Sequence, residues 1–169
     1  MAMRRLIVLI GLVVLGLPAA AGAFLDSSGD GTLVVDNAKG VVFLNLRGGV
    51  IGRFDQGTID VTDPVEGDGP APVVRDYQQI RRLGPRRFLY SGENVRFRLI
   101  GGLSKVRIEA TGIDVSAVGR GTATLDGSGF TELQTGRYSL NGGPFLAMPR
   151  VPARLTLGLQ PQPPPFRQK

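Results

Sequence analysis

The chain contains no cysteine, no histidine and no tryptophan, and only three of its basic residues are lysine. The lack of cysteine excludes disulfide bonds, thiol catalysis and cysteine metal sites. The lack of histidine removes the commonest general base and the commonest zinc ligand, which excludes serine–histidine, cysteine–histidine and zincin chemistry. Any catalysis would depend on carboxylates, on a Ser/Lys pair, on tyrosine or on a metal held by oxygen.

Residues 1–23 have the pattern of a secretory signal peptide. Arg4 and Arg5 supply a cationic start, residues 6–17 form an apolar run, and Ala21-Gly22-Ala23 supplies a small-residue cleavage site. The run is too short for a membrane-spanning helix, which needs about 20 apolar residues. We therefore expect cleavage after Ala23, with an uncleaved N-terminal anchor as the alternative. The mature chain would be exported and carry no transmembrane span.

The rest of the sequence is typical of an all-β protein. Glycine accounts for 25 residues and proline for 12, and helical periodicity is nearly absent. Short β-branched and aromatic runs recur about every ten residues, as in sandwiches and barrels. The sequence predicts one domain over residues 24–160, an antiparallel β-sandwich of roughly ten short strands, with a small closed β-barrel as the alternative. The predicted strands are residues 32–35, 41–47, 50–54, 58–62, 87–91, 95–100, 103–110, 113–117, 121–125, 137–140 and 153–159.

Three stretches interrupt this pattern. Residues 63–72 are acidic and contain three prolines, which predicts a turn-rich loop. Residues 73–84 fit either one helix face or a strand, and we favour extended structure. Residues 161–169 are proline-rich and cannot form a core, so a disordered tail is expected there.

Residues 94–109 predict a β-hairpin that turns on Gly101 and Gly102. Two adjacent glycines can both take the positive φ that a two-residue type I′ turn requires. This turn would pair residues 95–100 with residues 103–108 and sort apolar and basic side chains to opposite faces. The predicted anion-binding surface is the basic face of this hairpin, formed by Arg96, Arg98, Lys105 and Arg107.

Charge and export together suggest the kind of partner. Removal of Arg4 and Arg5 would leave 18 basic and 14 acidic side chains, a net charge of +4. A basic exported protein is biased toward anionic envelope polymers or lipid head groups. Nucleic acid is disfavoured as a partner, because no aromatic residues interleave with the basic face. Our first hypothesis is a non-enzymatic module, with no cofactor, that binds an anionic envelope component through the predicted basic face.

Two other functions are compatible with the sequence. Asp60 and Asp114 occupy similar contexts, and a carboxylate-dependent glycan hydrolase needs two such groups about 5 to 10 Å apart. The chain could instead assemble with itself or bind partners through an exposed strand edge.

One segment resembles the start of a calcium-binding loop. Residues 26–31 place Asp26, Ser28 and Asp30 at the spacing of oxygen ligands, followed by a glycine. The twelfth position of the loop is Asn37, where a bidentate glutamate is required, and no helices are expected beside it. We therefore favour a solvated turn and predict no bound metal.

Overall fold

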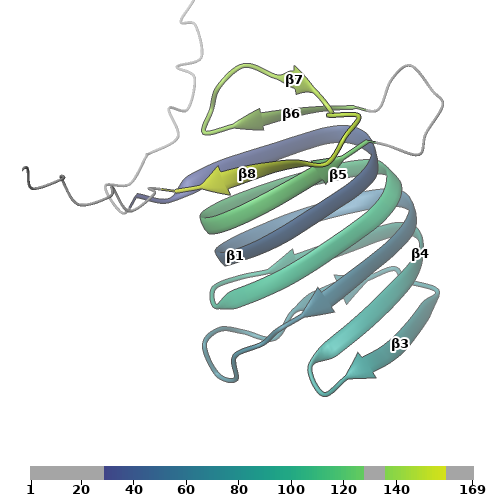
Figure 1. Cartoon of the computed structure of the whole chain (residues 1–169). Helices are drawn as coiled ribbons and strands as arrows, with labels where there is room; N and C mark the ends of the chain where they lie inside the picture. The colour runs from purple at the N-terminus through teal and green to yellow at the C-terminus, as the bar shows by residue number, and fades with distance from the viewer. Residues whose placement is uncertain (1–28, 128–135, 159–169) are drawn as a thin grey trace, which may run out of the picture.

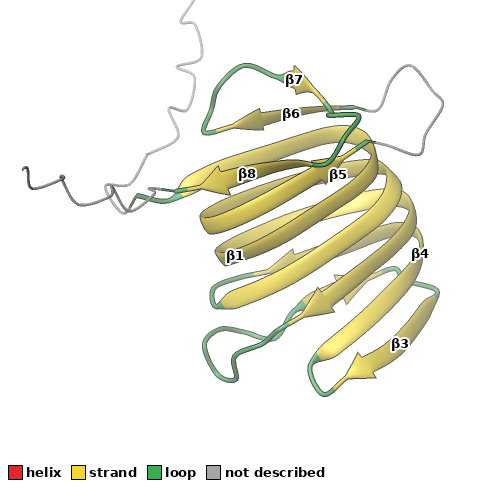
Figure 2. Ribbon diagram, viewed as in Figure 1, coloured by secondary structure: helices red, strands yellow, loops and turns green. Residues whose placement is uncertain are grey.

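The structure is a computed structural model, and it describes residues 29–127 and 136–158. These residues form one antiparallel sheet and contain no helix (Figure 2), which confirms the all-β prediction. The predicted signal peptide and proline-rich tail lie outside the described residues. The strands are β1 (Gly31–Thr62), β2 (Val73–Arg75), β3 (Gln79–Gly84), β4 (Arg87–Leu99), β5 (Leu103–Asp126), β6 (Arg137–Leu140), β7 (Leu146–Ala147) and β8 (Ala153–Leu157).

The two longest strands, β1 and β5, pair with each other in two registers. Ser116 of β5 lies between Val34 and Ile51 of β1, which are 17 residues apart. In the same way, Leu44 of β1 lies between Val106 and Ala123 of β5, which are 17 residues apart. Each strand therefore meets the other along both of its edges, because the pair winds around a common axis. Figure 1 shows the resulting turns stacked between β3 at one end and β6 to β8 at the other.

The coil is flattened into two walls. Wall A consists, in hydrogen-bonding order, of β2, residues 95–99, 50–54, 113–117 and 33–36, β6 and β7. Wall B consists of β3, residues 87–91, 58–62, 105–109, 41–47 and 121–125, and β8. The sheet is open, since β2 and β3 end it on one side and β7 and β8 on the other. The predicted sandwich of separate sheets is not confirmed, because β1, β4 and β5 run continuously from one wall to the other.

The strands change wall at corners that contain residues with positive φ. Such a backbone conformation redirects the chain locally while the neighbouring residues stay in the sheet. The predicted short strands are therefore mostly segments of longer strands, separated by corners instead of loops. The corner residues with positive φ are Asn37, Gly40, Gly48, Gly57, Gly92, Asn94, Gly112, Gly119 and Gly121.

The side chains that point between the walls form one hydrophobic core. Burial alternates strictly along residues 95–99 and 104–108, so every second side chain is buried. Burying one large aliphatic side chain contributes roughly 1.5 to 3 kcal/mol, which fixes the orientation of each segment and turns the intervening arginines outward. The largest fully buried side chains include Leu33, Leu44, Phe54, Ile59, Ile108, Ile113 and Leu125.

The stretch between β1 and β4 agrees with the sequence-based expectation. Residues 63–72 connect β1 to β2 and contain no strand. Residues 73–84 contain β2 and β3, so extended structure is confirmed. Both short strands pair with β4, which places β2 in wall A and β3 in wall B.

Candidate anion-binding site

The predicted hairpin at residues 94–109 is wrong in its pairing. Gly101 and Gly102 do have positive φ angles of 68° and 69°, as a type I′ turn requires. However, residues 95–99 of β4 pair with residues 50–54 of β1, whereas residues 103–109 of β5 pair with other segments of β1. The two glycines therefore lead the chain from wall A to wall B. An alternating pattern is satisfied equally well by this arrangement, since both walls bury every second side chain in the same core.

The four residues of the predicted basic face are consequently divided between the two walls. Arg96 and Arg98 lie on the outer surface of wall A, and Lys105 and Arg107 lie on the outer surface of wall B. All four side chains are exposed, so their predicted outward orientation is confirmed. The two pairs point away from each other, because the core lies between the walls. They do not form one continuous surface.

Each pair has one member that is neutralised by an acidic neighbour. The Nε atom of Arg96 lies 3.1 Å from a carboxylate oxygen of Asp76, and Nη1 of Arg107 lies 2.6 Å from Glu109. Within the described part of the chain, Arg98 and Lys105 have no ion-pair partner. An anion would therefore compete with a protein carboxylate at Arg96 and Arg107.

A third arginine, Arg75, lies near Arg96 and Arg98 on wall A. Arg75 of β2 lies directly opposite Arg96 of β4. A cleft of about 290 Å³ is lined by Val73, Arg75, Arg96, Phe97 and Arg98, and we call it the arginine cleft. Phe97 is almost fully buried, so the polar groups of this cleft come from the three arginines. Guanidinium groups present several N–H donors in a plane, which suits phosphate and carboxylate groups.

The arginine cleft continues into a row of like charges. Arg96 is flanked by Arg75 on one side and by Arg53 of β1 on the other. Like charges directly opposite each other cost roughly 0.2 to 1 kcal/mol per pair. Asp114 relieves part of this repulsion, because its carboxylate lies 2.9 Å from Nη2 of Arg53. Asp76 relieves another part at Arg96, and an external anion at Arg75 would relieve the remainder.

Sequence reasoning missed Arg75, although a signal was present. The alternation of Val73 and Arg75 fits a strand that turns both side chains to the same face. The register of β2 against β4, which brings Arg75 next to Arg96, is a contact between segments that are about 20 residues apart in the chain. No local pattern specifies it.

The structure does not bring Asp60 and Asp114 together. Asp60 lies on the outer surface of wall B, where Nε of Arg87 donates to both of its carboxylate oxygens at 3.0 Å. This hydrogen bond raises the pKa of Arg87. Asp114 lies on wall A, where it accepts hydrogen bonds from Arg53 and from the backbone N–H of Asn37. Neither pair of oxygens faces the other across a shared cleft, as hydrolysis by two carboxylates requires.

The three calcium candidates are not brought together as a site among the described residues. Asp26 and Ser28 lie outside the described residues. Asp30 is described, and its carboxylate accepts a hydrogen bond of 2.9 Å from Nε of Arg120. No group of three or more acidic side chains in residues 29–127 and 136–158 is arranged to hold a metal ion.

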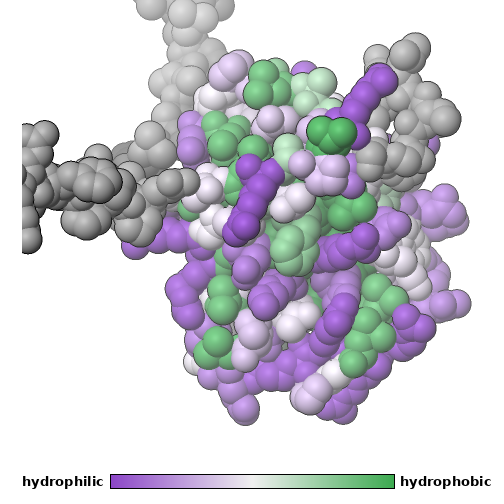
Figure 3. All heavy atoms as spheres, in the orientation of Figure 1, coloured by the Kyte–Doolittle hydropathy of each residue, from purple (hydrophilic) through white to green (hydrophobic). Residues whose placement is uncertain are grey.

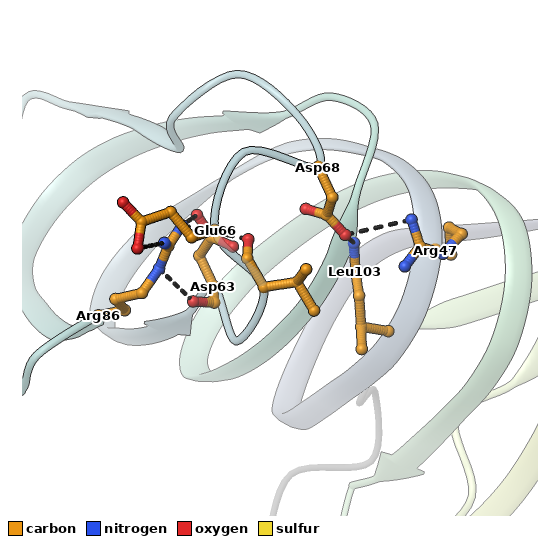
Figure 4. Close-up of polar contacts among 7 residues, drawn as sticks. Arg47, Asp63, Glu66, Asp68, Arg86 and Leu103 are labelled. Carbon is orange, nitrogen blue, oxygen red and sulfur yellow. Dashed lines mark hydrogen bonds and ion pairs between the residues drawn. The ribbon is translucent and has the colours of Figure 1, made fainter.

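Residues 63–72, which we call the acidic loop, have carboxylates that are neutralised by Arg86 (Figure 4). Nη2 of Arg86 lies 2.6 Å from Asp63, and its Nη1 lies 3.5 Å from Glu66. The hydrogen bond from Arg86 to Asp63 raises the pKa of this guanidinium group. The same arginine also donates to the backbone oxygens of Asp63 and Val65, which fixes the loop against the start of β4.

The far end of the acidic loop is anchored by Asp68 (Figure 4). Its Oδ2 atom accepts a hydrogen bond of 2.9 Å from the backbone N–H of Leu103 and lies 3.1 Å from Nη1 of Arg47. Both contacts lie beside the turn that carries the chain from β4 to β5. The acidic loop therefore has a structural role at this edge of the coil.

No protein-family model, curated protein or solved structure matches this chain. The described residues contain no helix of the length and apolar character needed to cross a membrane. On the face in view in Figure 3, hydrophilic residues predominate and hydrophobic residues reach the surface between them.

Proposed function

We propose that the chain is an exported, non-enzymatic β module that binds an anionic component of the cell envelope through the arginine cleft. The observation that carries this proposal is the convergence of Arg75, Arg96 and Arg98, from two adjacent strands, on one cleft. Arg75 and Arg98 have no ion-pair partner among the described residues, so both guanidinium groups are available to a ligand.

The low affinity expected of the arginine cleft for a single anionic group favours a ligand with many charges. A basic side chain near an anionic surface contributes about 1 kcal/mol. Three such residues would contribute roughly 3 kcal/mol, which corresponds to a dissociation constant above 1 mM for a single contact. A polymer or a surface that presents many anionic groups raises the apparent affinity through multivalency. An envelope polymer or a lipid surface therefore fits better than a small soluble anion.

A binding role is also supported by the position of the carboxylates. Asp60 and Asp114 lie on opposite walls, and each is held by an arginine. The two acids that the glycan-hydrolase hypothesis requires are therefore not assembled into one site. Binding of an anion in the arginine cleft requires no catalytic group, since charge-assisted hydrogen bonds from the arginines are sufficient to hold it.

The test is binding to inorganic polyphosphate over a range of salt concentrations. The full chain is expressed with its N-terminal segment and recovered after export, so that all variants share the same processing. The test variant is Arg75→Glu with Arg98→Glu on wall A. The matched control is Lys105→Glu with Arg154→Glu on wall B, which changes the net charge by the same amount at exposed residues without an ion-pair partner among those described.

We expect the wall A variant to bind polyphosphate at least tenfold more weakly than the wall B variant, because two charges of about 1 kcal/mol each are reversed at the cleft. Equal losses in the two variants would show that net charge alone governs binding. In that case the arginine cleft is not the site, and the proposal is overturned.

The edge-assembly alternative is favoured by one feature, the exposed edge of β3. This strand pairs only with β4 among the described strands, and Ile80 is 50% exposed. However, Arg81 and Arg82 stand in the same strand, and charged residues on an edge act against pairing with another copy. We therefore expect a monomer in solution, which light scattering during size-exclusion chromatography would check.

A further inference from the structure

We infer that the outer surface of wall A docks on a lipid bilayer that carries anionic head groups. This inference rests on the proposed function, because the arginine cleft supplies the electrostatic part of the contact. Its additional basis is a group of apolar side chains that the same wall exposes next to the cleft.

The apolar group lies in two neighbouring cross-strand rows. Ile51 is directly opposite Arg98 of the arginine cleft, and its row continues through Ser116 to Val34. In the next row, Val118 lies opposite Gly49, which has no side chain to cover it. Ile100 directly follows β4 and is exposed, whereas the preceding Leu99 is buried. We call these four residues the apolar strip; they are Val34, Ile51, Ile100 and Val118.

The four side chains of the apolar strip are all substantially exposed. Ile51 is 52% exposed, Val118 48%, Ile100 47% and Val34 37%. Single apolar residues at a surface need no explanation, but several neighbours on one face indicate an interaction site. The position of Ile51 opposite Arg98 brings the apolar strip and the arginine cleft together on the same wall.

A bilayer with anionic lipids provides a partner for both surfaces. Phosphate groups in the head-group layer can accept hydrogen bonds from the arginine cleft, and the adjacent acyl boundary can take up the apolar strip. A hydrophilic polyanion would engage the arginines and leave the four aliphatic side chains in water. The combination therefore favours a lipid surface over a soluble polymer.

The outer surface of wall B provides the contrast. Its central rows contain Thr62, Thr122, Thr124 and Thr156 together with the paired acids Asp60 and Glu109. Val41 and Phe43 also point outward there and are half-buried, and the more exposed aliphatic residues Ile80 and Leu83 lie in β3 at the edge of wall B. The centre of wall B is therefore more polar than the apolar strip, and wall B supplies the control positions.

The experiment measures sedimentation of the protein with vesicles of phosphatidylcholine alone or mixed with phosphatidylglycerol. Binding to inorganic polyphosphate is measured in parallel. The test variant is Ile51→Ser with Val118→Ser, and Val34→Ser with Ile100→Ser is a second test variant, in case the first lowers the unfolding temperature. The matched control is Ile80→Ser with Leu83→Ser on β3, which removes two exposed aliphatic side chains outside the apolar strip.

We expect the wild-type chain and the β3 control to bind the mixed vesicles and to ignore phosphatidylcholine alone. Each apolar-strip variant should bind the mixed vesicles at least tenfold more weakly and retain polyphosphate binding within about twofold. Wild-type affinity of both strip variants for mixed vesicles, equal binding to neutral vesicles, or no vesicle binding at all would each overturn the membrane inference.

Failure of the proposed function has a different result. If Arg75→Glu with Arg98→Glu leaves polyphosphate binding unchanged, the arginine cleft is not an anion site, and both proposals fall. If the same variant loses polyphosphate binding but no form of the protein sediments with vesicles, only the membrane inference falls.

Discussion

Gly48 and Gly119 lie directly opposite each other at one corner of the coil, with φ angles of 151° and 150°. A Cβ atom on Gly48 would lie 2.1 Å from the carbonyl oxygen of Val118, and one on Gly119 would lie 2.2 Å from the carbonyl oxygen of Arg47. Each glycine thus gives the opposite backbone the room it needs. The backbone N–H of Gly48 also donates to the carbonyl oxygen of Gly102, which ties the turn between β4 and β5 to this corner.

Gly48→Ala is therefore expected to destabilise the fold strongly. The added methyl group collides with backbone atoms that cannot move without disturbing β5, and the φ angle is unfavourable for alanine. We expect the free energy of unfolding to fall by roughly 2 to 4 kcal/mol, measured by urea denaturation.

Gly67→Ala is the matched control for this corner. Gly67 also has a positive φ, of 74°, but nothing lies within 4 Å of the position of its Cβ. Its substitution should cost only about 1 kcal/mol, the price of the backbone conformation alone. An equal decrease in the free energy of unfolding for the two variants would contradict the close approach of β1 and β5 at Gly48.

The strand segments could be predicted from the sequence, whereas the connections between them could not. Alternation of apolar and polar residues is a local property, and it correctly located segments such as 41–47, 58–62 and 113–117. The Gly48-Gly49 and Gly101-Gly102 pairs both resemble hairpin turns. In the structure, one is a corner inside β1 and the other leads from wall A to wall B. The 17-residue repeat of β1 against β5 depends on contacts far apart in the chain, which no local pattern encodes.

Ser104 provides a test of the core. It is 4% exposed, and its hydroxyl has no hydrogen-bond partner among the described residues. A buried hydroxyl without a partner is destabilising, because it has lost its contacts with water. Ser104→Ala should raise the free energy of unfolding by about 1 kcal/mol, measured by urea denaturation.

Ser139→Ala should have the opposite effect. Ser139 is also buried, at 6% exposure, but its hydroxyl donates a hydrogen bond of 2.6 Å to the carbonyl oxygen of Gly143. Its removal should lower the free energy of unfolding by about 1 kcal/mol. A loss of stability in both variants would mean that the Ser104 hydroxyl is satisfied, for example by a buried water molecule.

Only part of the candidate anion-binding site could be predicted, and the reason is the same as for the fold. The exposure of Arg96 and Arg98 follows from their alternation with Val95, Phe97 and Leu99, which are buried. Their neighbours depend on how β4 pairs, and the hairpin interpretation placed Lys105 opposite Arg98 where the structure places Ile51. That exchange replaces a cationic neighbour by an apolar one. It also gives wall A the mixed character on which the membrane inference depends.

The proposed export predicts a defined N-terminus. When the full chain is expressed in a host with a secretory pathway, the recovered protein should begin at Phe24 if Ala21-Gly22-Ala23 is the cleavage site that we propose. Intact-mass measurement would detect the loss of residues 1–23. Arg4→Glu with Arg5→Glu should reduce export, since the cationic start is part of the signal. Recovery of a chain that still begins at Met1 would contradict cleavage and favour the anchor.

Tyr90 is expected to give the fold a specific sensitivity to alkaline pH. It packs edge to face against Tyr77, with ring centroids 5.0 Å apart, and lies beside a cleft that also contains Phe88 and Val61. Burial, with a smaller contribution from Tyr77, raises the pKa of Tyr90 above its ordinary value of 10.0. In the unfolded chain this hydroxyl loses its proton first as the pH rises. Tyr90 therefore leaves stability unchanged below about pH 10 and lowers it as the pH rises from there through the pKa of the folded state.

Tyr90→Phe should remove this dependence, because phenylalanine keeps the ring contact with Tyr77 and has no hydroxyl to titrate. The free energy of unfolding of the variant should fall less steeply than that of the wild type above about pH 10. Tyrosinate absorbance should also lose a late component, one that titrates above the ordinary tyrosine pKa of 10.0. Tyr138→Phe is the control, since it removes one tyrosine and should leave the Tyr90 component in place. Persistence of the late component in Tyr90→Phe, or its loss in Tyr138→Phe, would show that burial at the end of the coil does not hold the Tyr90 proton.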